Sequence, residues 1–157
     1  MKEKILLLLL FFLPFVSSLI AQVPISISKN TDMNFGTIAA SSVGGTVVLS
    51  ASGSRFATGG IILPSINGIV CAAQFTVTGE PGYTYAITLP TDFTLYESGV
   101  SLASMVVNAF TSTPSATGTL AGGTQNVLVG AKLNVGASQA AGSYTNVLGF
   151  TVVVNYN

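Results

Sequence analysis

The chain has 157 residues, with five basic and five acidic side chains, no histidine and no tryptophan. Without histidine, Ser-His-Asp and Cys-His catalysis are excluded and the most common metal ligand is missing. The few charges form no basic patch that could neutralise nucleic acid phosphates. We therefore expect neither an enzyme nor a nucleic-acid-binding protein, and we expect no cofactor, metal or small-molecule substrate.

The first residues have the pattern of a secretory signal peptide. Lys2 and Lys4 precede an apolar run, residues 5–16, that is too short to span a bilayer comfortably, and small residues lead up to Ala21. We expect cleavage of residues 1–21 and export to the periplasm, the cell surface or the extracellular space. An uncleaved N-terminal anchor is the alternative.

The mature part, residues 22–157, has the length of a single domain. It contains three basic and four acidic residues, far fewer than an ordinary soluble surface carries. Ser, Thr, Asn and Gly must therefore provide solubility. Weak charge repulsion suits a protein that packs against copies of itself, and a generic exported domain with a Ser/Thr-rich surface is the alternative.

Short runs of alternating apolar residues between Gly and Ser clusters predict strands in the first half of the mature chain. The polar residues 29–32 are expected to end the first of them. Residues 80–82, Glu-Pro-Gly, form a strong turn signal, and we interpret the strands on either side as the clearest hairpin. The strands expected here cover residues 23–27, 46–51, 61–63, 74–78 and 83–89.

The second half continues this pattern, with a loop or weak hairpin at residues 111–123 and a turn region at 136–142. The strands expected here cover residues 93–97, 102–111, 126–135 and 149–157, the first of them at a sheet edge. Many short strands with Gly-rich turns predict an all-β protein. We expect a single immunoglobulin-like β-sandwich of short, mainly antiparallel strands.

The last run, residues 149–157, alternates with the period of a strand. Unpaired N–H and C=O groups on such an apolar strand would template another chain, so we expect a strand of the same chain or of a partner to cover it. Residues 23–28 have the spacing for either role, and their internal pairing is slightly favoured. The candidate strand-exchange or assembly residues are Val23, Ile25, Ile27, Phe150, Val152, Val154 and Tyr156. Burial is expected for Phe75, Phe150, Val152 and Val154.

The remaining candidate sites have simpler structural interpretations. Cys71 is the single cysteine, so it forms no intramolecular disulfide, and a buried small side chain is favoured over a reactive thiol. Asp92 and Glu97 are expected to be solvated loop carboxylates rather than a glycosidase pair. Tyr83 and Tyr85 share the face of an alternating run, so packing in the core is favoured over a sugar-stacking platform.

Four segments together carry a family resemblance. They are Met33-Asn34-Phe35-Gly36-Thr37-Ile38, Val129-Gly130-Ala131-Lys132-Leu133, Gln139-Ala140-Ala141-Gly142-Ser143-Tyr144-Thr145, and Phe150-Thr151-Val152-Val153-Val154-Asn155-Tyr156. In these the chain resembles the DUF4402 family over nearly all of its mature length. It is similar, more distantly, to the spore coat protein U-like domains of archaic chaperone–usher pilins. The pilin resemblance implies an incomplete sandwich that a strand from a chaperone or the next subunit completes.

We therefore expect an exported structural or surface protein, a fimbria-like (pilin-type) subunit that assembles by β-strand addition. Its partners would be copies of itself or a chaperone/usher-type assembly partner. The alternative is a monomeric secreted β-sandwich that binds a glycan or a surface partner. A self-complete domain stays open, because the residues before Phe35 are few for both a donor strand and a first strand.

Overall fold

The computed structural model describes residues 21–66, 68–99 and 102–157, so the expected signal peptide, apart from Ala21, lies outside the described residues. The described chain forms strands and turns without a helix, which confirms the all-β prediction. The strands are β1 Ser26–Thr31, β2 Ala39–Leu49, β3 Arg55–Ile62, β4 Ala73–Thr78, β5 Thr84–Thr88, β6 Asp92–Glu97, β7 Ser104–Thr113, β8 Thr117–Thr119, β9 Thr124–Val135, β10 Tyr144–Thr145 and β11 Val153–Tyr156.

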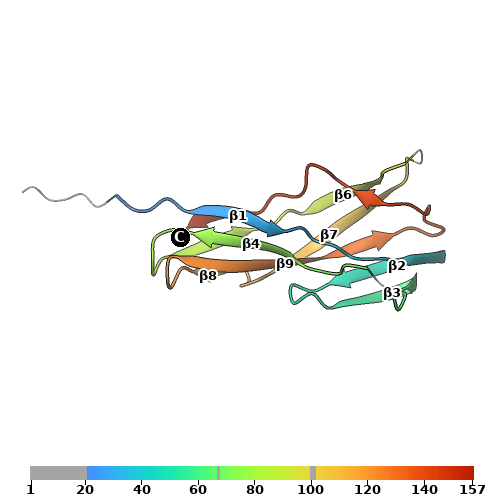
Figure 1. Cartoon of the computed structure of the whole chain (residues 1–157), viewed down its shortest axis with the longest axis horizontal. Coiled ribbons are helices and arrows are strands. Elements are labelled where there is room, and N and C mark those ends of the chain that lie inside the picture. Colours follow the sequence, from blue (N-terminus) through green and yellow to red (C-terminus); the bar gives the residue numbers. More distant parts are fainter. Residues whose placement is uncertain (1–20, 67, 100–101) are drawn as a thin grey trace, which may run out of the picture.

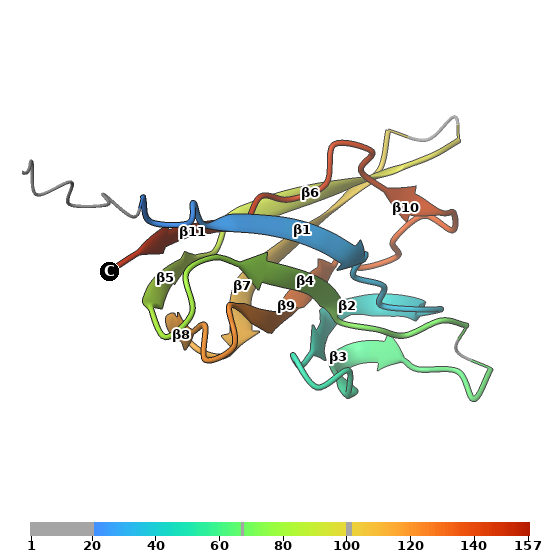
Figure 2. The ribbon, with the colours of Figure 1, turned by 60° about the vertical axis from the view of Figure 1, so that its left-hand side comes forward.

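The strands form a large antiparallel sheet and a small one. The large sheet has the order β1-β4-β9-β7-β6-β10, with β2 and β3 attached to β9 on a side branch (Figure 1). The small sheet has the order β11-β5-β8 (Figure 2). Each strand pair in both sheets is antiparallel. The small sheet lies near the C-terminus at one end of the elongated molecule (Figure 2).

The small sheet closes one half of the molecule. Its inward side chains pack against those of β4 and β9 in a single apolar core. Tyr85, Val77 and Val127 are fully buried there, because strand alternation places them on the facing sides of two sheets, and Leu120, directly after β8, is fully buried with them. We call this part the closed half, and its core residues are Ala73, Phe75, Val77, Tyr85, Ile87, Leu120, Val127, Val129, Val152 and Val154.

The predicted hairpin at residues 80–82 is wrong in its pairing. β4 pairs with β1 and β9, whereas β5 pairs with β8 and β11. The turn therefore carries the chain from the large sheet to the small one. The inward residues of both strands, such as Val77 and Tyr85, then meet face to face across the core instead of side by side in one ladder.

The long strand β9 connects the two halves of the molecule. On one of its edges, β4 pairs with residues 124–129 and β2 pairs with residues 131–135. Gly130 lies at the branch point, where a Cβ atom would be 2.3 Å from the Leu49 carbonyl oxygen. A side chain is therefore excluded where the two strands diverge.

Several sequence boundaries differ from the structure. β1 continues through Lys29 to Thr31, because its pairing with β4 holds the polar residues in the ladder. β3 begins at Arg55 and runs through the glycine pair, and β6 is an edge strand only in part, since β10 covers its last residues. The last strand, β11, covers only Val153–Tyr156 and is shorter than the expected strand at residues 149–157. Residues 149–152 precede it without strand pairing.

Most of the burial predictions are confirmed. Phe75, Val152 and Val154 are buried, whereas Phe150 is only half-buried. Phe150 lies between the two halves, with ring centroids 6.1 Å from Phe75, 5.9 Å from Phe93 and 5.1 Å from Phe110. The Cys71 side chain is half-buried, so the prediction that it is buried is wrong.

Candidate functional site

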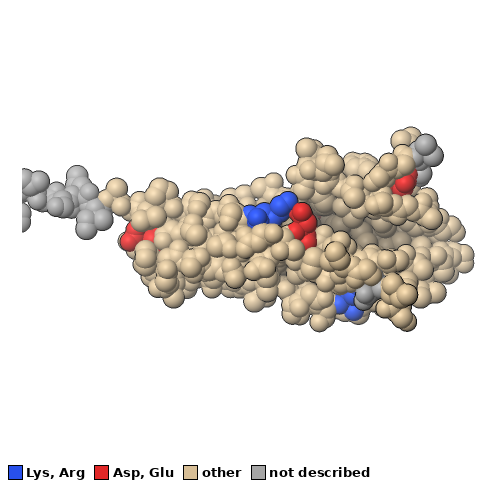
Figure 3. All heavy atoms as spheres, viewed as in Figure 1, with Lys and Arg blue, Asp and Glu red and all other residues tan. Residues whose placement is uncertain are grey.

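The second half of the large sheet faces a groove rather than another sheet. The groove has a volume of about 1040 Å³ and runs between residues 32–40 on one side and residues 139–150 on the other. Figure 3 shows this face as a nearly uncharged surface with a hollow in its right-hand part. The floor of the groove consists of Phe93, Leu95, Met105, Val107, Leu133 and Val135, from β6, β7 and β9.

The floor is only partly shielded from solvent. Val107 and Leu133 are buried, but Phe93, Leu95 and Met105 are half-buried. These three belong to β6 and β7, which the small sheet β11-β5-β8 does not cover. An apolar floor that is open in this way favours binding of an apolar segment, since covering it removes more apolar area from water.

The first wall, residues 32–40, is fixed by a few polar contacts. Asn34 and Cys71 exchange two main-chain hydrogen bonds, with N···O distances of 2.8 and 3.0 Å. The Arg55 guanidinium donates to the carbonyl oxygens of Phe35 and Thr37, the latter at 3.0 Å. Arg55 thereby holds an irregular segment against the edge of the large sheet, which a Lys with its single ammonium group would do less well.

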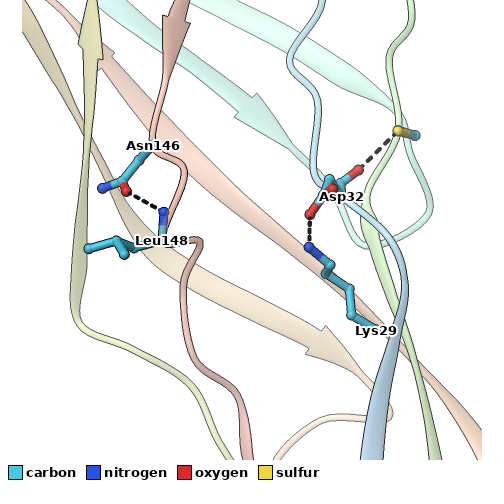
Figure 4. Close-up of polar contacts among 5 residues, drawn as sticks. Lys29, Asp32, Asn146 and Leu148 are labelled. Atoms are coloured by element: carbon cyan, nitrogen blue, oxygen red, sulfur yellow. Dashed lines mark hydrogen bonds and ion pairs between the residues drawn. The ribbon is translucent and has the colours of Figure 1, made fainter.

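An ion pair lies at one end of this wall. Lys29 Nζ is 2.6 Å from Asp32 Oδ1, and the Cys71 thiol donates to the Asp32 carbonyl oxygen at 3.3 Å (Figure 4). The Lys29 and Asp32 side chains are 54% and 77% exposed, so this pair adds little stability. Its two charges also cancel, which leaves the mouth of the groove without a preference for a charged ligand.

The second wall explains the Gln139-to-Thr145 motif. Gln139 Nε2 donates to Tyr144 Oη at 2.8 Å, and Tyr144 Oη donates to the Ala140 carbonyl oxygen at 2.7 Å. A Cβ atom on Gly142 would lie 2.6 Å from Glu97 Cγ, so a larger residue there would displace the Glu97 side chain. The motif therefore folds the chain back so that Tyr144 and Thr145 pair with β6 as β10.

Beyond β10, the second wall turns around Asn146. Its amide Nδ2 donates to the Thr94 carbonyl oxygen at 2.8 Å, and its Oδ1 accepts from the Leu148 N–H at 3.0 Å. Figure 4 shows Asn146 and Leu148 on one side of the view and Lys29 and Asp32 on the other, with strands of the large sheet running behind. The Leu148 side chain is 90% exposed, so the rim of this wall is apolar.

Main-chain groups on both walls lack partners within the described chain. The N–H groups of Phe35 and Thr37 on the first wall, and of Val147 and Phe150 on the second, donate no hydrogen bond there. Unpaired N–H groups beside an apolar floor are the features that an added β-strand uses.

The candidate strand-exchange residues lie mostly in the closed half and not in the groove. Ile25 and Ile27 pack against the core that contains Val152 and Val154, and Phe150 is the one of the seven that lines the groove. Ile27 is paired with Val77, so the structure places the first segment on its own chain.

Tyr156 ties the ends of this half together. Its hydroxyl donates to the Val23 carbonyl oxygen at 2.6 Å and accepts from the Glu80 N–H at 2.5 Å. The Glu80 carboxylate in turn accepts from the Val23 N–H at 2.9 Å. The sequence motif ending in Tyr156 therefore has a structural role, anchoring both the first described residues and the sheet-crossing turn.

The remaining chemical candidates do not assemble into a site. Asp92 and Glu97 lie at opposite ends of β6, and Tyr85 is completely buried, so Tyr83 and Tyr85 form no exposed platform. Burial raises the pKa of the Tyr85 phenol, whose hydroxyl donates to Gln125 Oε1 at 2.8 Å. Within the described residues, no group of three or more His, Cys, Asp and Glu side chains could hold a metal ion.

The groove itself was not predicted from the sequence. The strands that contain Phe93, Leu95 and Met105 alternate in the same way as strands of a closed core. No local signal in them shows that a second sheet is missing on this side. The described residues also include no helix that is long and apolar enough to cross a membrane.

Together these features define an all-β protein with two antiparallel sheets and an open apolar groove. The family model for a domain of unknown function, DUF4402, matches residues 25–156. The chain therefore belongs to the DUF4402 family, as the four sequence segments predicted. No curated protein and no solved structure matches it.

Proposed function

We propose that this DUF4402 protein is an exported structural or surface subunit that accepts an extended strand from a partner in its groove, in the manner of a pilin. The observation that carries the proposal is the groove, whose apolar floor lies between two walls with unpaired main-chain N–H groups. An extended segment would satisfy both features. Its carbonyl groups would accept from the walls, and its alternate side chains would cover the floor.

The chemistry of the groove defines the donor. The floor is apolar and the charges of Lys29 and Asp32 are paired, so the donor should be an uncharged segment with apolar residues at every second position. Residues 23–28, Val-Pro-Ile-Ser-Ile-Ser, fit this description. A second copy could supply this segment by releasing it from β4, where Ile25 and Ile27 are only half-buried.

Export is part of the same proposal. It is supported by the basic start, the short apolar run and the small residues before Ala21. The low charge of the mature chain also favours association between copies.

A peptide titration tests the groove. A synthetic peptide of residues 22–28 would be added to the mature protein labelled with ¹³C at the methionine methyl groups, since Met33 and Met105 both line the groove. We expect both methyl resonances to shift and the midpoint of thermal unfolding to rise with peptide concentration. A control peptide with Ser at positions 23, 25 and 27 should have no effect.

Two variants locate the binding. Leu95→Glu places a charge on the groove floor and should abolish the shifts, whereas Ile66→Glu changes a residue that is 89% exposed outside the groove and should leave them unchanged. The proposal fails if millimolar peptide leaves the Met105 resonance unmoved, or if the serine peptide shifts it equally.

A second candidate function, a monomeric binding module for a glycan, is favoured by the outer face of β1, β4 and β9. Uncharged side chains form a connected row there: Asn30 Nδ2 donates to Thr76 Oγ1 at 2.8 Å, and Thr76 Oγ1 donates to Asn126 Oδ1 at 3.1 Å. Hydroxyl and amide groups of this kind can bind sugar hydroxyls. Glycan binding that Thr76→Val abolishes and Leu95→Glu leaves intact would favour this function over strand addition.

A further inference from the structure

The residue that follows the expected cleavage site is a glutamine. Cleavage after Ala21 makes Gln22 the first residue of the mature chain, with a free α-amine. The side-chain amide of the same residue then lies within reach of that amine, and their reaction closes a five-membered ring. An intramolecular attack of this kind has the full advantage of proximity and needs no second reactant.

The fold leaves Gln22 free to react. Gln22 is exposed, and its side chain has no hydrogen bond within the part of the chain that the structure describes. The first described residues lie at the same end of the molecule as the C-terminus (Figure 2). No packed side chain therefore has to move for the ring to close.

The next residue is held in place by its main chain. The Val23 N–H donates to Glu80 Oε2 at 2.9 Å, and the Val23 carbonyl oxygen accepts from Tyr156 Oη at 2.6 Å. Ring closure uses only the α-amine and the side chain of Gln22, so it leaves both hydrogen bonds intact. The modified residue would sit directly before a fixed point of the fold.

Ring closure also removes a charge. The α-ammonium of Gln22 is replaced by a neutral lactam. An ammonium at this exposed position would stabilise the fold little as a partner of Glu80, so its loss costs little. Residues 23–28 have no charged side chain, so the lactam makes the whole segment before Lys29 neutral, as the proposed donor strand requires.

On the basis of the cleavage in the proposed function, we propose that Gln22 is a modification site that cyclises to pyroglutamate in the mature protein. The lone pair of the neutral α-amine attacks Cδ of the side-chain amide. A bond forms between the α-nitrogen and Cδ, and the bond between Cδ and Nε2 breaks. Nε2 leaves as ammonia with a proton from the amine, so nothing is oxidised or reduced.

Mass spectrometry of the N-terminal peptide of the exported protein tests the site. Free amines are first blocked by reductive dimethylation, so that no ring can close during handling, and the chain is then cut before Asp32. We expect the peptide of residues 22–31 to carry one blocked amine, at Lys29, and to be lighter by one ammonia. The matched control is Gln22→Asn, which keeps the amide but would need a strained four-membered ring. Its peptide should carry two blocked amines and lose no ammonia.

The outcomes separate the modification from export. A mature chain that begins at Gln22 with a blocked α-amine would overturn the modification and leave export standing. A chain that is cut at another position would do the same, whereas a chain that keeps residues 1–21 would overturn both. Loss of ammonia from the Gln22→Asn peptide would place the reaction elsewhere in residues 22–31 and would also overturn the proposal.

Discussion

The closed half and the groove half of this protein share one sheet but differ in what covers it. In the closed half, β11, β5 and β8 pack over β4 and β9, and Leu120, Val127 and Tyr85 are fully buried. In the groove half, irregular segments pack along the sides of the sheet, and Leu95 and Met105 stay half-buried. The same strand alternation thus produces a complete core where a second layer is present and an open apolar groove where it is missing.

β9 and Phe150 show how the two halves are coupled. Alternate residues of β9, from Val127 to Val135, are buried along its whole length, so this strand belongs to both cores. Phe150 packs on Phe75 of the closed half and on Phe93 of the groove floor. A ligand in the groove would therefore contact a residue that the closed half also needs, and binding should stabilise the whole domain.

The largest expected effect comes from removing the same atoms in each half. Leu120→Ala, at a completely buried position, should destabilise the protein by about 2–5 kcal/mol. Leu95→Ala, on the half-buried floor of the groove, should cost about 1 kcal/mol or less, because solvent already reaches the site. Urea unfolding measures the free energy of unfolding of both variants. Equal losses would show that the groove floor is packed as tightly as the closed core.

Phe150→Ala tests the connection between the halves. It removes a ring that contacts three others, so we expect a loss of about 2–4 kcal/mol. The control Phe56→Ala, at a position that is 57% exposed, should cost less than about 0.5 kcal/mol. A similar loss for both variants would mean that Phe150 does not join the cores.

Gly118→Ala tests how tightly the closed half is packed. A Cβ atom at Gly118 would lie 2.4 Å from Tyr85 Oη and 2.4 Å from Gln125 Oε1, so the variant should lose about 1–3 kcal/mol through overpacking. Gly122 has no atom within 4 Å of its Cβ position, and Gly122→Ala should be neutral. Differential scanning calorimetry of Gly118→Ala and Gly122→Ala measures the difference in their stability. A neutral Gly118→Ala would reveal more room around Tyr85 than the structure has.

The smallest effect is a pH dependence from the closed half. Burial raises the pKa of Tyr85, so the folded state favours the neutral phenol over the phenolate. This contribution to stability is fully present below about pH 10, the ordinary tyrosine pKa, and is lost as the pH rises through the raised value in the folded protein.

The variant Tyr85→Phe removes the titrating group. It should cost about 1 kcal/mol at neutral pH for the lost hydrogen bond, while Gln125 Oε1 keeps the Thr119 N–H at 2.9 Å. The alkaline loss of stability should be smaller in this variant than in the wild type. Identical alkaline unfolding curves for the two proteins would exclude Tyr85 as its source.

The sequence by itself determined the strands and their inward faces. Alternation in residues 74–78 and 149–157 correctly identified Phe75, Val152 and Val154 as core residues, because the strand period is local and each face is either apolar or polar. It also identified the family, since the Gln139-to-Thr145 motif and Tyr156 perform structural roles that depend on particular side chains.

Only the tertiary structure decided which strands pair and which faces stay open. The Glu80-Pro81-Gly82 turn has the residues of a hairpin, but β4 and β5 belong to different sheets, and Val77 and Tyr85 are buried together in the core between them. The groove likewise depends on the layer that is missing above Leu95 and Met105. Whether a strand face is buried or open is set by segments far away in the chain, and the alternation of a single strand cannot encode that.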